Sequence, residues 1–398
     1  MKITGTKTIA RMLKRFYQWL SNRRHFLFSW YTKDSQETQE PERSLVELPS
    51  DLRNQLVEAV ENLPNNPADQ NIILSKLDEL FESWRNDPKN SSNSIVILSS
   101  PITAVSKILA DTLEEWTKQK DVSLKLLPLD ARPLAINSIK SKLEYHLAQE
   151  SRENQVGSQL EIVLIPNLSW CFLRSLEGLE GIEYLQSLLC EDTEGRFWII
   201  GGGKVGWEYL NSVCALEAYC GEVITLPKIS PEDAQEWFEP VVTQLNIAFE
   251  EPRLDKQLLD GDKDNQNSYF KLLTDLAQGV STIMVQVFLK SICYQETDES
   301  AQSEVKTLIA KTPKLTKLPS LESDDRYLLY SLLLHGDMTI QELAESLGDA
   351  RAEIQARVEM LRRKGVVEQK EQILKINPIY YPQLKRELAS NNFIINRE

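Results

Sequence analysis

Residues suited to metal binding and redox chemistry are scarce in this 398-residue chain. No two of its five cysteines form a C-x-x-C pair, and all five fall in or beside apolar stretches, which predicts reduced core thiols. The three histidines, His25, His146 and His335, lie far apart in the sequence. We therefore expect neither a disulfide framework nor a zinc site built on them. The cysteines are Cys171, Cys190, Cys214, Cys220 and Cys293.

Long hydrophobic runs are missing as well. No stretch approaches the ~20 apolar residues that cross a bilayer, and the longest candidates, such as residues 197–203, are short enough to be buried strands. The N-terminus lacks the apolar region and the small-residue cleavage site of a secretory signal. At 41% hydrophobic, the chain can still bury two or three cores. These features favour a cytoplasmic protein.

Acidic side chains are absent from one segment of an otherwise acidic protein. Residues 1–33 hold eight basic side chains and no acid, whereas the whole chain has 45 basic and 59 acidic residues and a net charge of −14. The remainder therefore carries −22, and a field of that sign repels nucleic acid unless a local basic patch intervenes. This asymmetry predicts a separate role for the N-terminal segment.

That segment has the pattern of a basic amphipathic helix, which is typical of interfacial membrane anchors. Two interpretations are open. In the first, residues 1–33 contact a partner or the inner face of a membrane. In the second, they pack on the protein's own acidic body. Residues 34–50 are polar and acidic and predict a flexible linker. The candidate contact residues are Lys7, Arg11, Lys14, Arg15, Phe16, Trp19, Arg23 and Arg24.

Short apolar runs alternate with helical patterns over residues 51–228. This alternation predicts a parallel α/β sheet with helices on both faces. Predicted strands are 95–99, 123–127, 161–165, 196–201 and 222–226, and predicted helices between them include 105–119, 135–149 and 178–190.

The first predicted strand leads into a turn and a helix, as in a phosphate-binding loop of the form G-x-x-x-x-G-K-[ST]. Laid on that pattern, Ser100 and Val105 take the places of the two glycines. Ser106 takes the place of the lysine, and Lys107 that of the Ser/Thr. Each position that would contact phosphate or metal is therefore changed.

Over residues 66–295 the order and spacing of these elements resemble the AAA+ and STAND groups of P-loop ATPases. In those proteins the third strand ends in acids that hold Mg²⁺ and orient water, but Pro166 and Asn167 stand there in this sequence. The strand, Leu-Pro pair and Ser230-Pro231 helix start that follow look like the entry to a helical lid over residues 229–295. The resemblance thus implies the fold without the catalytic residues.

A glycine-rich stretch at residues 201–206 lies between a predicted strand and a predicted helix. It is either a tight structural turn or a phosphate cradle, since glycines let backbone N–H groups approach an anion. We expect no bound cofactor, although ATP or ADP would be the ligand of a vestigial site. The candidate residues for that site are Ser100, Ser106, Lys107, Gly202, Gly203 and Lys204.

Residues 323–390, beyond a polar linker at 296–322, resemble a winged-helix (helix-turn-helix) domain. Helices are predicted at 324–335 and 338–348, a recognition helix at 350–364, and two wing strands at 365–369 and 372–376. The recognition helix mixes basic and acidic residues, so contact with protein and contact with DNA both stay open. Its candidate contact residues are Arg351, Arg357, Arg362, Arg363 and Lys364.

The sequence therefore predicts an α/β protein with a P-loop-NTPase-like parallel sheet, a helical lid and a winged helix. The function that fits best is non-catalytic: a regulatory or scaffold protein that binds protein partners, an active ATPase relative or further copies of itself. The first alternative is a DNA-binding transcriptional regulator that uses the winged helix. The second is a weak nucleotide-binding protein.

Overall fold

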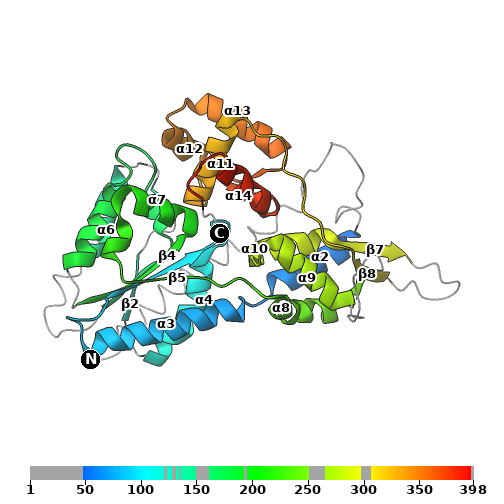
Figure 1. Cartoon of the computed structure of the whole chain (residues 1–398), viewed down its shortest axis with the longest axis horizontal. Coiled ribbons are helices and arrows are strands. Elements are labelled where there is room, and N and C mark those ends of the chain that lie inside the picture. The colour runs from blue at the N-terminus through cyan, green and yellow to red at the C-terminus, as the bar shows by residue number, and fades with distance from the viewer. Residues whose placement is uncertain are drawn as a thin grey trace.

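The computed structural model describes most of the chain beyond residue 47, and Figure 1 shows it as three groups of elements around a common centre. The basic segment 1–33 and nearly all of the predicted linker 34–50 lie outside the described residues, so both stay predictions. The described residues are 48–120, 123–127, 131–133, 135, 137–148, 161–191, 195–250, 265–296 and 306–395.

A five-stranded sheet forms the first group, with strand order β2-β3-β4-β1-β5 and every pairing parallel. Each residue of β1 is buried, as expected for an apolar strand covered by helices on both faces. The predicted α/β class and parallel sheet are confirmed. The strands are β1 (Ser94–Ser99), β2 (Ser123–Leu126), β3 (Glu161–Ile165), β4 (Arg196–Gly203) and β5 (Glu222–Thr225).

Helices cover both faces of this sheet. On one face, α3 (Pro67–Asn86) and α4 (Val105–Lys120) enclose a core in which Phe81 meets Trp116 and Phe197 edge to face. The other face is covered by α5 (Ser138–Ala148), α6 (Glu180–Glu191), α7 (Lys204–Cys214) and the short helices η4 (Leu168–Cys171) and η5 (Leu216–Tyr219).

The lid helices form the second group: α8 (Pro231–Gln244), α9 (Asn265–Ala277) and α10 (Ser281–Ser291). Ser230 caps α8 as predicted, since its hydroxyl accepts from the N–H of Asp233 at 3.0 Å. Helix α2 (Ser50–Glu61) contacts α8 and α10, so it belongs with the lid by packing although the sequence grouped it with the sheet. Figure 1 shows it among the lid helices.

A small second sheet lies beside the lid, in the order β6-β8-β7. Its strands are β6 (Ala248–Phe249), β7 (Ile292–Glu296) and β8 (Lys306–Ala310). Strand β8 falls within the predicted linker 296–322, so part of that segment is ordered, with Leu308 and Ala310 buried. A run of three apolar residues, 308–310, between lysines and polar residues gave too weak a signal for a strand.

The C-terminal group has the helix-turn-helix and wing that the sequence predicts. Gly348 ends α12 in the left-handed conformation at φ 76°, which glycine adopts without a Cβ clash. The elements are α11 (Ser323–His335), α12 (Ile340–Leu347), α13 (Arg351–Arg363), β9 (Val367–Lys370), β10 (Ile373–Ile376), η6 (Pro378–Tyr380) and α14 (Tyr381–Ser390).

This winged helix contacts both other groups. Helix α11 packs on α7 of the sheet domain, and η6 packs on α10 of the lid. The approach of α11 is close at Gly206 in α7, where a Cβ would lie 2.7 Å from the carbonyl oxygen of Leu334. A larger residue at 206 would separate the two helices.

Candidate functional site

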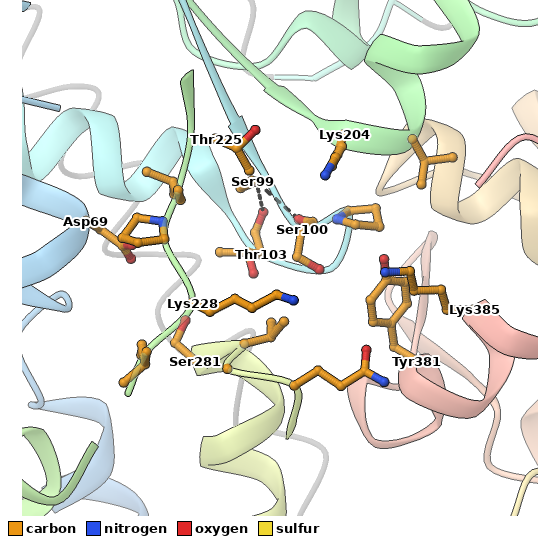
Figure 2. A pocket seen from close by; sticks show the side chains of 18 of the residues that line it. Asp69, Ser99, Ser100, Thr103, Lys204, Thr225, Lys228, Ser281, Tyr381 and Lys385 are labelled. Atoms are coloured by element: carbon orange, nitrogen blue, oxygen red, sulfur yellow. Dashed lines mark hydrogen bonds between the residues drawn. The ribbon is translucent and has the colours of Figure 1, made fainter. Parts of the chain in front are cut away.

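A cleft opens where the sheet, the lid and the winged helix meet (Figure 2). Its walls come from the carboxyl ends of β1 and β5, the first turn of α7, the lid turn at 278–281 and helix α14. Open mouth and adjoining solvent included, it encloses about 830 Å³. The carboxyl edge of a parallel sheet is where such folds usually bind ligands.

Only two of the six residues proposed for a vestigial phosphate site line this cleft. Ser100 and Lys204 do, but Ser106, Lys107, Gly202 and Gly203 are not part of its wall. Ser106, which takes the place of the P-loop lysine, is only 8% exposed on α4. A short hydroxyl held in that way cannot reach toward a phosphate as a lysine would.

The turn between β1 and α4 is closed by its own hydrogen bonds. The N–H of Thr103 donates to the carbonyl of Ser100 at 2.9 Å, and the N–H of Val105 donates to that of Thr103 at 2.9 Å. The Ser99 hydroxyl bonds the carbonyls of Ser100 and Thr103 at 3.1 and 3.3 Å. Because a phosphate cradle needs outward-facing amides, this turn lacks two of its donors.

The glycine-rich stretch forms no loop. Gly201, Gly202 and Gly203 are the last residues of β4 and pair with Ile97, Leu98 and Ser99 of β1. A Cβ at Gly201 would lie 2.5 Å from Leu109 Cδ1 and 2.6 Å from the Pro166 carbonyl oxygen, so glycine is required there by packing. The predicted tight turn is therefore replaced by a strand end that leads directly into α7, and the phosphate-cradle interpretation stays a prediction.

No acid follows β3. Pro166 and Asn167 stand there, and the Asn167 side chain accepts from the N–H of Ser169 at 3.1 Å to cap η4. Within the described ranges no group of three or more His, Cys, Asp or Glu side chains could hold a metal ion. The described helices also include none long and apolar enough to cross a membrane.

Positive charge dominates the cleft. Lys204 lies on α7, Lys228 in the segment between β5 and α8, and Lys385 on α14, and Figure 2 shows them pointing toward the same space. Among the described residues of the wall Asp69 is the one acid; burial raises its pKa from 3.8 to about 6. Sequence reasoning missed Lys228 and Lys385, because only the folded chain brings these distant segments together.

The lid wall of the cleft is fixed by a short turn. Gln278 and Gly279 have φ of 53° and 72°, which glycine accepts at the second position without strain. The Gly279 carbonyl accepts from the N–H of Ile229 at 3.0 Å, next to Lys228. The Thr103 hydroxyl lies 3.2 Å from that of Thr282 in α10, so the β1–α4 turn and the lid also touch directly.

The candidate residues of the recognition helix have acidic or carbonyl partners at three of five positions. Arg357 pairs with Asp324, Arg362 with Glu359 at 2.7 Å, and the Lys364 Nζ lies 3.4 Å from the Ser320 carbonyl. Arg351 and Arg363 are exposed. Helix α11 packs on α7 of the sheet domain, and Figure 1 shows α13 on the outer side of the winged helix.

Buried polar groups join the winged helix to the sheet domain. Arg132 donates to the carbonyls of Ser169 and Phe172 at 2.7 and 2.8 Å and reaches Glu342 of α12. The His335 Nε2 accepts from the N–H of Arg174 at 3.3 Å. Burial, with the cations of Arg132 and Arg174 nearby, holds the pKa of His335 well below its ordinary 6.5.

The cysteines only partly match their prediction. All five are free, and burial raises the pKa of the Cys171 thiol to about 12, as expected for an inert core residue. Cys190, however, is exposed at the end of α6. Its apolar neighbours Leu188 and Leu189 suggested a core position, but the last turn of an amphipathic helix also presents a solvent side.

No family model and no curated protein matches the chain. Its fold is similar to those of solved AAA+ ATPases. The Thermotoga maritima RuvB Holliday junction branch migration motor is 11% identical, covers 82% of this chain and 96% of its own, and gives a TM-score of 0.30. Cdc6p from Pyrobaculum aerophilum is 12% identical over 84% of this chain and 98% of its own, with a TM-score of 0.34.

The Aeropyrum pernix ORC2 protein is 10% identical over 83% of this chain and 98% of its own, with a TM-score of 0.35. This similarity concerns the fold alone, and at these scores no statement about function rests on it. The assignment to an AAA+-like α/β fold stands on the strand order, the lid and the helices that follow.

Proposed function

We propose that this protein is a non-catalytic AAA+-like regulatory or scaffold subunit that works through protein contacts. One observation carries the proposal: the β1–α4 turn is closed by its own hydrogen bonds, and Ser106 is buried where the P-loop would place its lysine.

Phosphoryl transfer on this fold needs a cation on the β- and γ-phosphates, a carboxylate for Mg²⁺ and a group that orients water. At the matching positions stand Ser106, Pro166 and Asn167, and Asn167 is engaged as a helix cap. None of these side chains can take over the missing role. The sheet, the lid and the winged helix are retained, and they offer surfaces for packing. Such surfaces suit a subunit that holds partners in place.

The partners we propose are proteins: further copies of this chain or an active ATPase relative, because AAA+ folds commonly assemble into oligomers. The basic segment 1–33 would contribute a membrane or partner surface. Sedimentation with anionic liposomes tests that part, with the full chain compared with a chain lacking residues 1–33. Equal sedimentation of both would remove the anchor.

ATP turnover tests the main proposal. We expect the purified chain with Mg²⁺ and ATP to release phosphate at background rate, and Ser106→Ala and Lys107→Ala to leave that rate unchanged. Turnover above background that Lys107→Ala abolishes would overturn the proposal, because a contaminating ATPase would not respond to the substitution.

A second candidate function is DNA binding by the winged helix. It is favoured by the outward position of α13 and by the exposure of Arg351 and Arg363. If DNA binds, its affinity should fall steeply with salt and should fall further with Arg362→Ala/Arg363→Ala. Binding that ignores both changes would remove this candidate.

A further inference from the structure

We propose that residues 391–395, which follow helix α14, form a strap that fastens the winged helix to the sheet domain and the lid. Ile395 lies in the wall of the cleft where the three groups meet and is only 3% exposed. The inference goes beyond the proposed function, because it assigns part of the cleft to the chain's own residues and concerns no partner.

The strap begins with a reversal of the chain at the end of α14. The N–H of Asn392 donates to the Ala389 carbonyl at 3.3 Å, and the N–H of Phe393 donates to the Leu388 carbonyl at 3.2 Å. With Asn392 left-handed at φ 63°, this pair of bonds is the Schellman pattern that ends many helices. Asparagine adopts that conformation more readily than most residues other than glycine. The chain therefore turns back at this point and does not continue along the axis of α14.

An aromatic contact then holds the strap against α11. The ring of Phe393 lies 5.0 Å, centroid to centroid, from the rings of both Tyr327 and Tyr330. The N–H of Ile395 donates to the Phe393 carbonyl at 2.9 Å, which turns the chain a second time. As a result Ile394 is 46% exposed, whereas Ile395 is buried. Two adjacent isoleucines thus have opposite environments.

The inner end of the strap lies among residues from all three groups. The cleft wall that contains Ile395 also contains Pro101 and Val205 of the sheet domain, Val280 of the lid and Tyr381 of α14. Ile395 belongs to the buried hydrophobic cluster that runs through these groups. Because burial of apolar surface is favourable, the strap stabilises the arrangement in which this side of the cleft stays closed.

Release of the strap is a local event. The backbone hydrogen bonds described for it go to α14 and to Phe393, whereas β1 is paired along both edges, with β4 and with β5. Segments held by few contacts open at a lower free energy than core strands do. Withdrawal of Ile395 would expose apolar wall and weaken the junction of the lid with the winged helix. The strap therefore controls how firmly these two groups are joined.

Hydrogen exchange of the full chain, measured by mass spectrometry, tests the inference. Ile395→Asp places a carboxylate in the apolar wall and should release the strap. We expect exchange in the lid turn, residues 278–284, and in α14 to rise about tenfold or more, while β1 exchanges as in the parent. Ile394→Asp is the matched control, since it makes the same change at the exposed neighbour, and should leave all three segments unchanged.

Thermal melts establish that each variant folds, and Ile395→Ala, which adds no charge, carries the test if the aspartate variant does not fold. A rise in the fluorescence of the apolar dye ANS that is confined to the Ile395 variants would support exposure of the cleft wall. Equal exchange in the two aspartate variants would overturn the inference. So would a rise of equal size in β1, because Ile395 would then be an ordinary core residue whose loss loosens the whole protein.

Discussion

Arg132 and Glu342 form a buried salt bridge between the sheet domain and the winged helix, with N···O at 3.4 Å and side chains 2% and 5% exposed. Both side chains also form hydrogen bonds outside this pair. Arg132 also donates to the Ser169 and Phe172 carbonyls, and Glu342 accepts from the N–H of Thr339 at 2.6 Å to complete the capping box of α12. The bridge therefore fixes η4 and the start of α12 at once.

Arg132→Met should destabilise the protein strongly, because it leaves the Glu342 carboxylate buried without its cation. Loss of one partner of a buried pair typically costs about 3–5 kcal/mol. Urea unfolding followed by tryptophan fluorescence measures the change. Arg357→Met is the control, because its partner Asp324 is 60% exposed and such pairs contribute at most about 1 kcal/mol. Equal losses in both variants would contradict the buried bridge.

His335 should make stability depend on acid. It faces the cations of Arg132 and Arg174 and the ring of Phe172, and its folded-state pKa lies well below 6.5. As the pH decreases, the imidazole therefore binds a proton in the unfolded chain before it does so in the folded one. This residue's contribution to the free energy of unfolding is fully present above pH 6.5 and decreases below that pH. Urea midpoints at pH 7.5 and 5.5 measure this fall. His335→Gln should reduce the difference between the two, and an unchanged difference would assign it to other groups.

Two glycines that lie four residues apart, Gly202 and Gly206, should respond differently to alanine. A Cβ at Gly206 would lie 2.7 Å from the Leu334 carbonyl oxygen, whereas one at Gly202 would meet nothing closer than 3.5 Å. Gly206→Ala should destabilise by about 1–3 kcal/mol through overpacking of α7 against α11. Gly202→Ala should change the thermal midpoint little. If both substitutions are neutral, the close approach of the two helices is wrong.

Asp69→Asn should stabilise the protein at neutral pH. Its pKa rises on folding from 3.8 to about 6, so the folded carboxyl holds its proton more tightly than the unfolded one. Stability therefore falls between about pH 4 and pH 6, and above that range the buried charge costs up to about 3 kcal/mol. The thermal midpoints of the two proteins should differ at pH 7.5 and converge at pH 4. A constant difference would contradict the shift.

Local patterns predicted most of the fold. Continuous apolar runs located the strands of the parallel sheet, because both sheet faces are buried, and capping residues such as Ser230 and Gly348 located helix ends. Sequence patterns gave the wrong local structure where contacts between distant segments determine it. Gly201–Gly203 continue β4 because β1 supplies hydrogen-bond partners, which no local rule for glycine anticipates.

The cleft could be predicted only in part. Ser100 and Lys204 adjoin strand ends that the sequence located, so their position at the sheet edge followed. Lys228, Lys385 and Asp69 come from segments whose neighbours are set by how the lid and the winged helix pack. Arg132 is similar: its partners lie 37 and 210 residues away in the sequence.

The three groups of elements are connected pairwise. The β1–α4 turn meets the lid at Thr103 and Thr282, α10 of the lid meets η6, and α11 meets α7. Because each group contacts both of the others, a displacement of the lid from the sheet domain would also strain the α10–η6 contact with the winged helix. The winged helix is thereby a third support for the position of the lid.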